Sequence, residues 1–205
     1  MSHRVVCVSR ALGAGGEEVA HLVSDALGFR FVDDEIIIRA ADRAGVPPAT
    51  ITEAEHTPSL LARILEALAT VPMGAEGGAG IMPPVYPVLT YTDLIERVIR
   101  EVANEGDVII VAHGASIPLA SSPSVLRVLV TASPGVRAER MSAAQGIDLR
   151  AATKAIEASD RERHQFLRRF YDVGHELPTH YDMTVNTDAL TVAAAAHLVV
   201  QAAQG

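Results

Sequence analysis

The chain has 205 residues, 49% of them apolar, which is enough to bury one sizeable core and fits a single domain or a domain with a small insertion. Its formal net charge of −8 argues against a general binding surface for nucleic acid or for an anionic membrane. We therefore expect no DNA or RNA partner. Because no apolar run approaches the roughly 20 residues that span a bilayer, we also expect a cytoplasmic globular protein with no membrane anchor.

Short apolar runs alternate along the chain with longer segments of helical periodicity. In chain order, the predicted elements are a strand at residues 4–8, a helix at 17–27, a strand at 29–32, a helix at 35–44, a helix at 92–104, strands at 108–111 and 125–130, helices at 134–144 and 149–170, a strand at 183–185 and a helix from Thr191. Apolar strands separated by helices are typical of a parallel sheet that is buried on both faces. The sequence therefore predicts an α/β fold with about five parallel strands and helices on both sides of the sheet.

Two further features lie between the second and the third of these helices. Five apolar residues mark one face of another predicted helix; they are Leu60, Leu61, Ile64, Leu65 and Leu68. Residues 72–87 are rich in glycine and proline and show neither helical nor strand periodicity, which predicts a loop. Apolar side chains such as Ile81 and Tyr86 lead us to expect that this loop is poorly ordered or packs against a second chain, which would allow a homo-oligomer.

Two features of the sequence could indicate a reactive thiol or a metal site, but a structural role explains each of them better. Cys7 is the only cysteine and lies within an apolar run, so we predict a buried side chain rather than a reactive thiol. The stretch HELPTH at residues 175–180 is similar to a zinc protease motif, but its two histidines are one position too far apart and Pro178 breaks the helix that would align them. We therefore predict no metal site from the sequence.

The stretch SRALGAGGEE, residues 9–18, joins the first predicted strand to the first predicted helix. Its glycines are Gly13, Gly15 and Gly16. They allow backbone N–H groups to turn around an anion, with the helix N-terminus behind them. A usual phosphate loop ends in a lysine followed by Ser or Thr, whereas Glu17 and Glu18 stand here. Glutamates are also ordinary residues of a first helical turn, so these residues alone leave phosphate binding and a plain turn equally open.

Several short motifs follow one another in an order that covers most of the chain. They are Ser9-Arg10, Gly13-Ala14-Gly15-Gly16, Leu27-Gly28, Phe31-Val32-Asp33 with Glu35-Ile36-Ile37, Ala112-His113-Gly114-Ala115, Asp160 with Arg161 and Arg163, and the stretch HYDMTVNT at 180–187. In these motifs the chain resembles the cytidylate-kinase-like branch of the P-loop nucleoside monophosphate kinases, whose phosphate loop also lacks the lysine. One position departs from that family, because His113 stands where an arginine is usual.

The resemblance implies a P-loop kinase that uses ATP and Mg²⁺ to phosphorylate a nucleoside monophosphate, cytidylate-like, or another small acceptor. It also implies a single domain with an acceptor-binding helical insertion at about 34–91 and a lid at about 146–175. The residues implied to bind the ATP phosphates are Ser9, Arg10, Gly13, Ala14, Gly15, Gly16 and Glu17. We expect the side chains of Glu17 and Glu18 to project away from the bound phosphate.

Four arginines lie in the segment that the resemblance assigns to the lid: Arg161, Arg163, Arg168 and Arg169. On a helix the first, third and fourth share roughly one face, while Arg163 lies off it. Arginines of a lid make forked contacts with phosphate when the lid closes, and we assign Arg161 and Arg163 to catalysis. The alternative is a solvated face on which the arginines pair with Asp160 and Glu162.

Three more residues are candidates for the site. Asp33 follows the second strand and is also assigned to catalysis, since it could orient the acceptor or hold magnesium through water; its alternative role is to cap the next helix. Arg39 and His113 are assigned to binding of the acceptor. Arg39 matches a position where the family carries an arginine for the acceptor phosphate, although a surface arginine explains it equally well. His113 could touch a substrate phosphate when protonated or serve as a neutral, hydrogen-bonded residue at the sheet edge.

Two classes of function remain open from the sequence. The retained Asp33, Arg39 and lid arginines favour a working kinase. The lysine-free loop, its two glutamates and His113 favour a protein of the same fold that binds a nucleotide or phosphate but has lost turnover.

Overall fold

A computed structural model describes residues 2–56 and 91–205 of the chain. The predicted helical face between Leu60 and Leu68 and the predicted loop at 72–87 lie outside the described residues. The chain divides into two compact units, one comprising residues 1–34 and 99–205 and the other comprising residues 35–98. The larger unit contains the sheet, and the insertion expected at about 34–91 stays a prediction.

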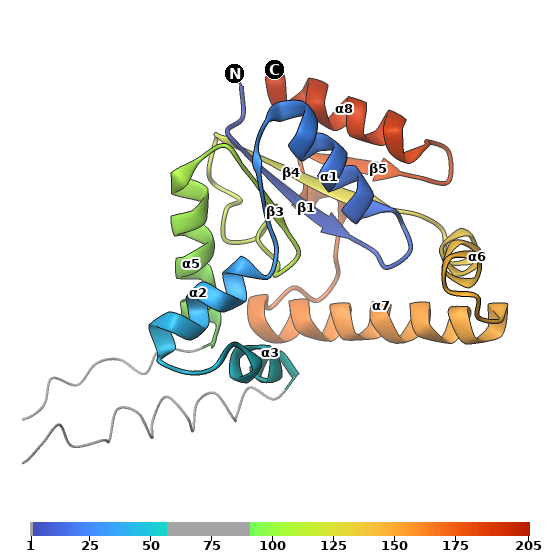
Figure 1. Cartoon of the computed structure of the whole chain (residues 1–205), viewed down its shortest axis with the longest axis horizontal. Coiled ribbons are helices and arrows are strands. Elements are labelled where there is room, and N and C mark those ends of the chain that lie inside the picture. Colours follow the sequence, from blue (N-terminus) through green and yellow to red (C-terminus); the bar gives the residue numbers. More distant parts are fainter. Residues whose placement is uncertain (1, 57–90) are drawn as a thin grey trace, which may run out of the picture. The chain divides into compact units, whose positions relative to one another are not determined.

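Five parallel strands form one sheet in the order β2-β3-β1-β4-β5 (Figure 1). The strands are β1 (Val5–Arg10), β2 (Arg30–Val32), β3 (Val108–Val111), β4 (Val125–Thr131) and β5 (Met183–Asn186). The first strand is central, with Val6 opposite Ile109 of β3 on one side and Leu126 of β4 on the other. Since all five strands run in the same direction, their carboxyl ends share one edge. The predicted parallel α/β fold is confirmed.

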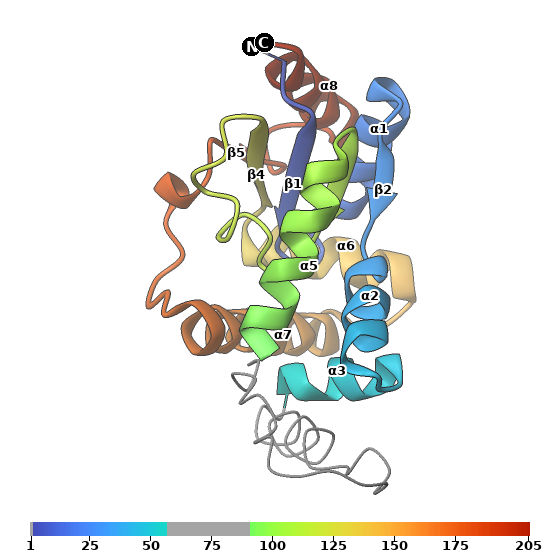
Figure 2. The same ribbon diagram turned by 90° about the vertical axis from the view of Figure 1, so that its left-hand side faces the viewer.

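Helices cover both faces of this sheet. On one face α1 (Gly16–Leu27) and α8 (Val192–Gln204) lie side by side. Their buried valines and alanines form one apolar cluster with alternate residues of β1, β3 and β4. Figure 2 shows α5 (Tyr91–Glu105) in front of β1, on the other side of the sheet.

Two more helices of the larger unit, α6 (Pro134–Gln145) and α7 (Leu149–Tyr171), pack against each other. Ala138 and Met141 of α6 meet Ala152 and Ile156 of α7 in a small separate core. A backbone N–H of the first turn of α7 donates to the carboxylate of Asp148 at 2.9 Å, which caps the start of this helix.

The smaller unit contains α2 (Glu35–Ala44) and α3 (Pro48–His56), which pack against each other. The sequence predicts α2 but not α3, because Pro47 and Pro48 are typical of a segment that follows a helix. Pro48 instead begins the next helix, where its missing N–H would have no helical partner in any case. A short 3₁₀ turn at Pro178–His180, in the larger unit, is likewise absent from the prediction.

Cys7 lies in the middle of β1 and is 1% exposed. Burial raises the pKa of its thiol to about 12, and the nearby charge of Arg127 only partly opposes this. The thiol therefore stays protonated near neutral pH, which confirms the predicted buried and inert side chain.

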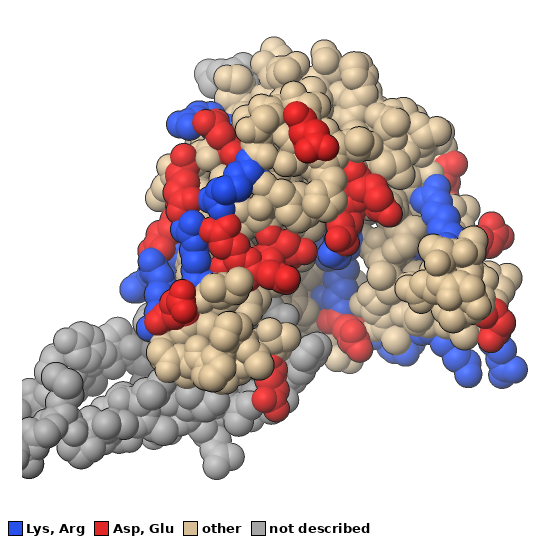
Figure 3. All heavy atoms as spheres, viewed as in Figure 1, with Lys and Arg blue, Asp and Glu red and all other residues tan. Residues whose placement is uncertain are grey.

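The surface of the described residues carries both signs of charge. On the face shown in Figure 3, Lys and Arg side chains are interspersed with Asp and Glu side chains. Over residues 2–56 and 91–205, no helix is both long enough and apolar enough to pass through a membrane.

Candidate active site

A glycine-rich loop connects β1 to α1 at the carboxyl edge of the sheet. Gly13 and Gly15 have φ angles of 76° and 75°, in the left-handed region that other residues enter only at a cost in free energy. A Cβ atom at Gly16 would lie 2.5 Å from the Cβ atom of Arg10, so this position has no room for a side chain. The N–H of Ala14 donates to the carbonyl of Ala11 at 3.0 Å. The N–H groups of the three glycines are left to face an anion, and the shape of the loop fits a phosphate.

Side chains from distant elements hold this loop in place. The hydroxyl of Thr187 donates to the carbonyl of Ala14 at 2.8 Å, and Arg140 of α6 donates to the hydroxyl and the carbonyl of Thr187. The side chain of Ala14 is completely buried. Of this residue, only the backbone can therefore contribute to binding.

A cavity of about 490 Å³ lies beside the loop, and small-molecule sites usually have volumes of about 300–1,000 Å³. One wall is the loop between Arg10 and Glu18. The rest of the lining consists of Arg140, Met141, Ala144, Gln145 and Val192. The cavity therefore combines a phosphate-shaped loop with a cationic and apolar wall.

Glu17 and Glu18 are among the residues that line this cavity, and the expectation that their side chains project away from a bound phosphate stays a prediction. A carboxylate oxygen of Glu17 lies 3.4 Å from Nη2 of Arg10, and 55% of the Glu17 side chain is exposed. The attraction of Arg10 accounts for this orientation. Arg10 is thus partly neutralised while water still screens much of the charge on Glu17.

At Arg10, polar side chains from the ends of three strands meet. Arg10 ends β1, Asp33 follows β2 and His113 follows β3. Nη2 of Arg10 lies 4.0 Å from Oδ2 of Asp33, and Nε2 of His113 lies 3.5 Å from Oδ1 of the same carboxylate. The structure therefore brings the predicted residues Asp33 and His113 together with the phosphate loop.

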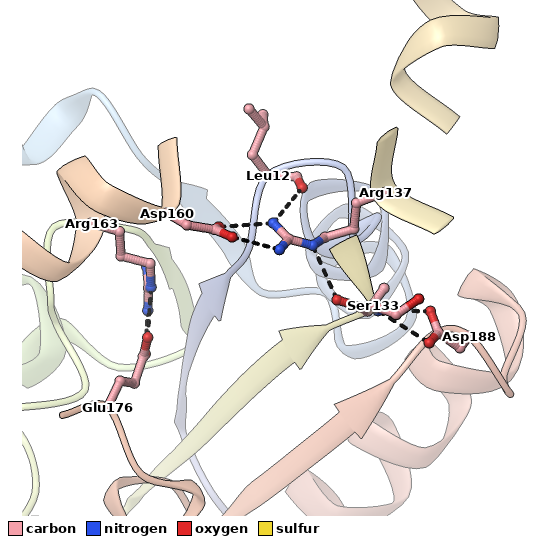
Figure 4. Close-up of polar contacts among 8 residues, drawn as sticks. Leu12, Ser133, Arg137, Asp160, Arg163, Glu176 and Asp188 are labelled. Atoms are coloured by element: carbon pink, nitrogen blue, oxygen red, sulfur yellow. Dashed lines mark hydrogen bonds and ion pairs between the residues drawn. The ribbon is translucent and has the colours of Figure 1, made fainter. Parts of the chain in front are cut away.

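Arg163 of α7 reaches this cluster through the backbone of Arg10, and Figure 4 shows its pair with Glu176. Its Nη1 donates to the carbonyl of Arg10 at 3.4 Å. Its Nε and Nη2 donate to the two carboxylate oxygens of Glu176 at 2.8 and 2.5 Å. The hydroxyl of Tyr181 donates to the same carboxylate and also interacts with the buried Ser9.

Burial opposes the ionisation of Glu176, but the hydrogen bond and the charge of Arg163 outweigh it and hold the pKa of Glu176 below its ordinary value of 4.5. Burial, followed by the hydrogen bond to Glu176, raises the pKa of Tyr181. Both effects indicate that Glu176 is ionised and Tyr181 is protonated near neutral pH. The Glu176 carboxylate thus neutralises Arg163 within the site.

We predict that Glu176→Gln lowers the free energy of unfolding by about 1–2 kcal/mol at pH 7, because it leaves the guanidinium of Arg163 uncompensated. A carboxyl group whose pKa is lower in the folded protein than in the unfolded chain stabilises the fold at pH values above its unfolded pKa. This stabilisation is lost as the pH falls through the folded pKa. The difference between wild type and variant should therefore shrink below about pH 4.5. Urea unfolding at several pH values measures it. Glu157→Gln, at an exposed position of α7, is the control, and a difference that persists in acid would contradict the prediction.

The sequence reasoning missed Arg137, which is 4% exposed and connects three elements (Figure 4). It donates to the carbonyl of Ala132 after β4, to the carbonyl of Leu12 in the phosphate loop and to both carboxylate oxygens of Asp160 in α7. Arg137 and Arg140 lie three residues apart on the predicted helix 134–144. That spacing puts both on one face and is the signal that could have found them.

The remaining predicted residues make other contacts. Arg161, Arg168 and Arg169 are exposed on α7. Arg163, which lies off the face that these three share, is the arginine beside the loop. Asp160 pairs with Arg137 of α6 rather than with the arginines of its own helix. Arg39 belongs to the smaller unit, where it pairs with Glu35 at 2.5 Å.

A glycine loop at the carboxyl edge of a five-stranded parallel sheet, with arginines from two helices around it, defines the fold of a P-loop kinase. The chain belongs to the cytidylate kinase-like family, which it matches over residues 5–189. No curated protein matches it. The family and the fold are those of phosphotransferases.

Solved structures support the same fold at low sequence identity. An uncharacterized protein from Eubacterium ventriosum ATCC 27560 is 13% identical, with a TM-score of 0.66 and coverage of 98% of each chain. Shikimate kinase from Bacteroides thetaiotaomicron is 14% identical, with a TM-score of 0.52 and coverage of 97% of each chain. At these identities the likeness concerns the fold and not the substrate.

Proposed function

We propose that the protein is an ATP-dependent phosphotransferase that acts on a nucleoside monophosphate, cytidylate-like, or on a small acceptor of similar size. One arrangement carries this proposal: the phosphate loop borders a cavity, and Arg10, which lines that cavity, also belongs to the cluster with Asp33 and His113. A kinase needs two sites that meet at a transferable phosphate.

The residues around the loop suit separate parts of the reaction. The backbone N–H groups of the loop and Arg10 would bind the ATP phosphates, and the cavity wall with Arg140 and Met141 would hold the rest of the nucleotide. Arg163 would stabilise the charge of the transferred group. These groups take the place of the missing loop lysine.

Asp33 is the residue best placed to orient the acceptor or to hold Mg²⁺, which typically binds one or two carboxylates, phosphate oxygens and water. When bound, Mg²⁺ supplies charge neutralisation at the phosphates. His113, beside Asp33, would contact the acceptor. Arg39 stays a predicted ligand of an acceptor phosphate.

A second candidate function is a nucleotide-binding or phosphate-binding protein of the same fold with little turnover. It is favoured by the pairing of two arginines near the loop with carboxylates: Arg10 with Glu17 and Arg163 with Glu176. A bound phosphate would have to compete with these carboxylates.

A calorimetric titration of ATP with Mg²⁺ into the wild type, followed by a turnover assay with nucleoside monophosphates, separates the two functions. Binding with turnover supports the kinase, and binding without turnover supports the second candidate. A wild type that binds no nucleotide at millimolar concentration would contradict both.

We predict that Glu17→Lys raises the affinity for ATP by about tenfold, because it replaces a like charge at the cavity by an opposite one. The effect stays moderate since 55% of the Glu17 side chain is exposed to screening water. Glu157→Lys changes the net charge of the protein equally at an exposed position of α7 and should leave the affinity unchanged. Equal affinities of wild type and Glu17→Lys would place Glu17 outside the nucleotide site.

A further inference from the structure

The turn that carries His113 has an unusual backbone. Ala112, His113 and Gly114 have φ angles of 66°, 51° and 66°, so three consecutive residues lie in the left-handed region. For residues other than glycine this conformation costs free energy, and it persists only where surrounding contacts hold it. The turn directly follows β3 and places His113 beside Asp33.

Backbone hydrogen bonds account for the two ends of the turn. The N–H of Ala112 donates to the carbonyl of Val8 in β1 at 3.2 Å, and the N–H of Ala115 donates to the carbonyl of Ala112 at 3.2 Å. The carbonyl of Gly114 accepts from the N–H of Ile117 at 2.9 Å. The middle carbonyl, that of His113, accepts from a side chain instead.

That side chain is Tyr171. Its hydroxyl donates to the carbonyl of His113 at 3.1 Å. Its ring lies so close to Gly114 that a Cβ atom there would be 2.5 Å from the ring carbon Cε2. The ring of Phe166 in turn meets the Tyr171 ring edge-on, with centroids 5.9 Å apart. Tyr171 therefore contacts two of the three strained residues and is itself held by packing.

Tyr171 is the last residue of α7, the helix that also carries Asp160 and Arg163. The chain leaves this helix at Asp172, whose N–H bonds to the carbonyl of Leu167. From its middle α7 contacts Arg10 through Arg163, and from its C-terminal end it contacts the His113 turn through Tyr171. A single helix thus connects the two sides of the candidate active site.

We propose that Tyr171 is a positioning residue that holds the strained turn and keeps the imidazole of His113 close to Asp33. Without the hydroxyl, the carbonyl of His113 loses its anchor and the turn can relax toward ordinary backbone angles. The imidazole then moves away from the carboxylate. The position of His113 would thereby depend on the position of α7.

The decisive variant is Tyr171→Phe, which keeps the ring against Gly114 and removes only the hydroxyl. The imidazole signals of the eight histidines are recorded by NMR, and His113→Gln assigns the signal of His113. We expect this signal to shift or broaden in Tyr171→Phe. The signals of His21 in α1 and His197 in α8 should stay in place, which also shows that the variant is folded.

Phe166→Leu is the matched control, because it changes the packing around Tyr171 and leaves the hydroxyl. Its His113 signal should stay near the wild-type position. An unchanged His113 signal in Tyr171→Phe would overturn the proposal. Equal shifts of all histidine signals, or equal shifts of His113 in both variants, would also overturn it, because they would indicate a merely structural role.

A kinetic readout follows, and it alone rests on the proposed function. Tyr171→Phe should raise KM for the acceptor by about fivefold, the loss expected for one hydrogen bond between uncharged groups, with KM for ATP unchanged. Equal changes in both KM values would contradict a role specific to the acceptor side. Because the imidazole signal does not depend on turnover, a wild type without kinase activity would contradict the proposed function and leave the NMR test intact.

Discussion

Gly16→Ala should destabilise the protein by about 3 kcal/mol and abolish measurable nucleotide binding. The added Cβ atom would lie 2.5 Å from the Cβ atom of Arg10 and 3.3 Å from that of Val130. Arg10 belongs to β1 and Val130 belongs to β4, and these two strands pair with each other in the centre of the sheet. Neither can move without shifting a strand, so the start of α1 and the loop before it must move instead.

Urea unfolding followed by circular dichroism measures the loss of stability, and calorimetry with ATP measures the loss of binding. Gly135→Ala is the matched control, because a Cβ atom at Gly135 meets nothing within 4 Å and the residue lies in the first turn of α6. This variant should be as stable as the wild type or more stable by up to about 1 kcal/mol. A Gly16→Ala protein with wild-type stability would show that the loop is more open than the structure indicates.

The sheet could be predicted from the sequence because its central strands are short runs of consecutive apolar residues. Residues 108–111 read Val-Ile-Ile-Val and are all buried, which is typical of a parallel strand with helices on both faces. The helix α3 could not be predicted in the same way. Two adjacent prolines indicate both the end of one helix and the start of the next, and the sequence does not decide between them.

The part of the site that the sequence predicts lies at strand ends. Asp33 and His113 each follow an apolar strand, and parallel strands bring their carboxyl ends to one edge. Pairing between distant segments is harder to foresee. Arg137 meets Asp160 across a helix pair, and Glu176 reaches Arg163 from the segment after α7. Helical periodicity relates residues within one element only, so it groups Arg161 with Arg168 and Arg169 and gives no reason why Arg163 should lie beside the loop.

Asp160→Ala should lower the free energy of unfolding by about 2 kcal/mol, because it leaves the guanidinium of Arg137 buried without its carboxylate. The Arg137 side chain is only 5% exposed, whereas that of Asp160 is 42% exposed. Water can therefore enter on the Asp160 side, which keeps the loss below the 3–5 kcal/mol typical of a completely buried pair. Glu157→Ala, one turn earlier on the exposed side of α7, is the control and should have little effect.

The double variant Arg137→Met with Asp160→Ala tests the physical reason. If the unpaired charge causes the loss, removing that charge as well should recover part of it, and the two single changes should be non-additive by at least about 1 kcal/mol. Full recovery is not expected, since Arg137 also donates to the carbonyls of Ala132 and Leu12. Asp160→Ala should also weaken ATP binding, because Arg137 without its carboxylate no longer fixes Leu12 beside Gly13. Additive losses of stability in a urea-unfolding cycle, or unchanged ATP affinity in Asp160→Ala, would contradict a link from α7 to the phosphate loop through this ion pair.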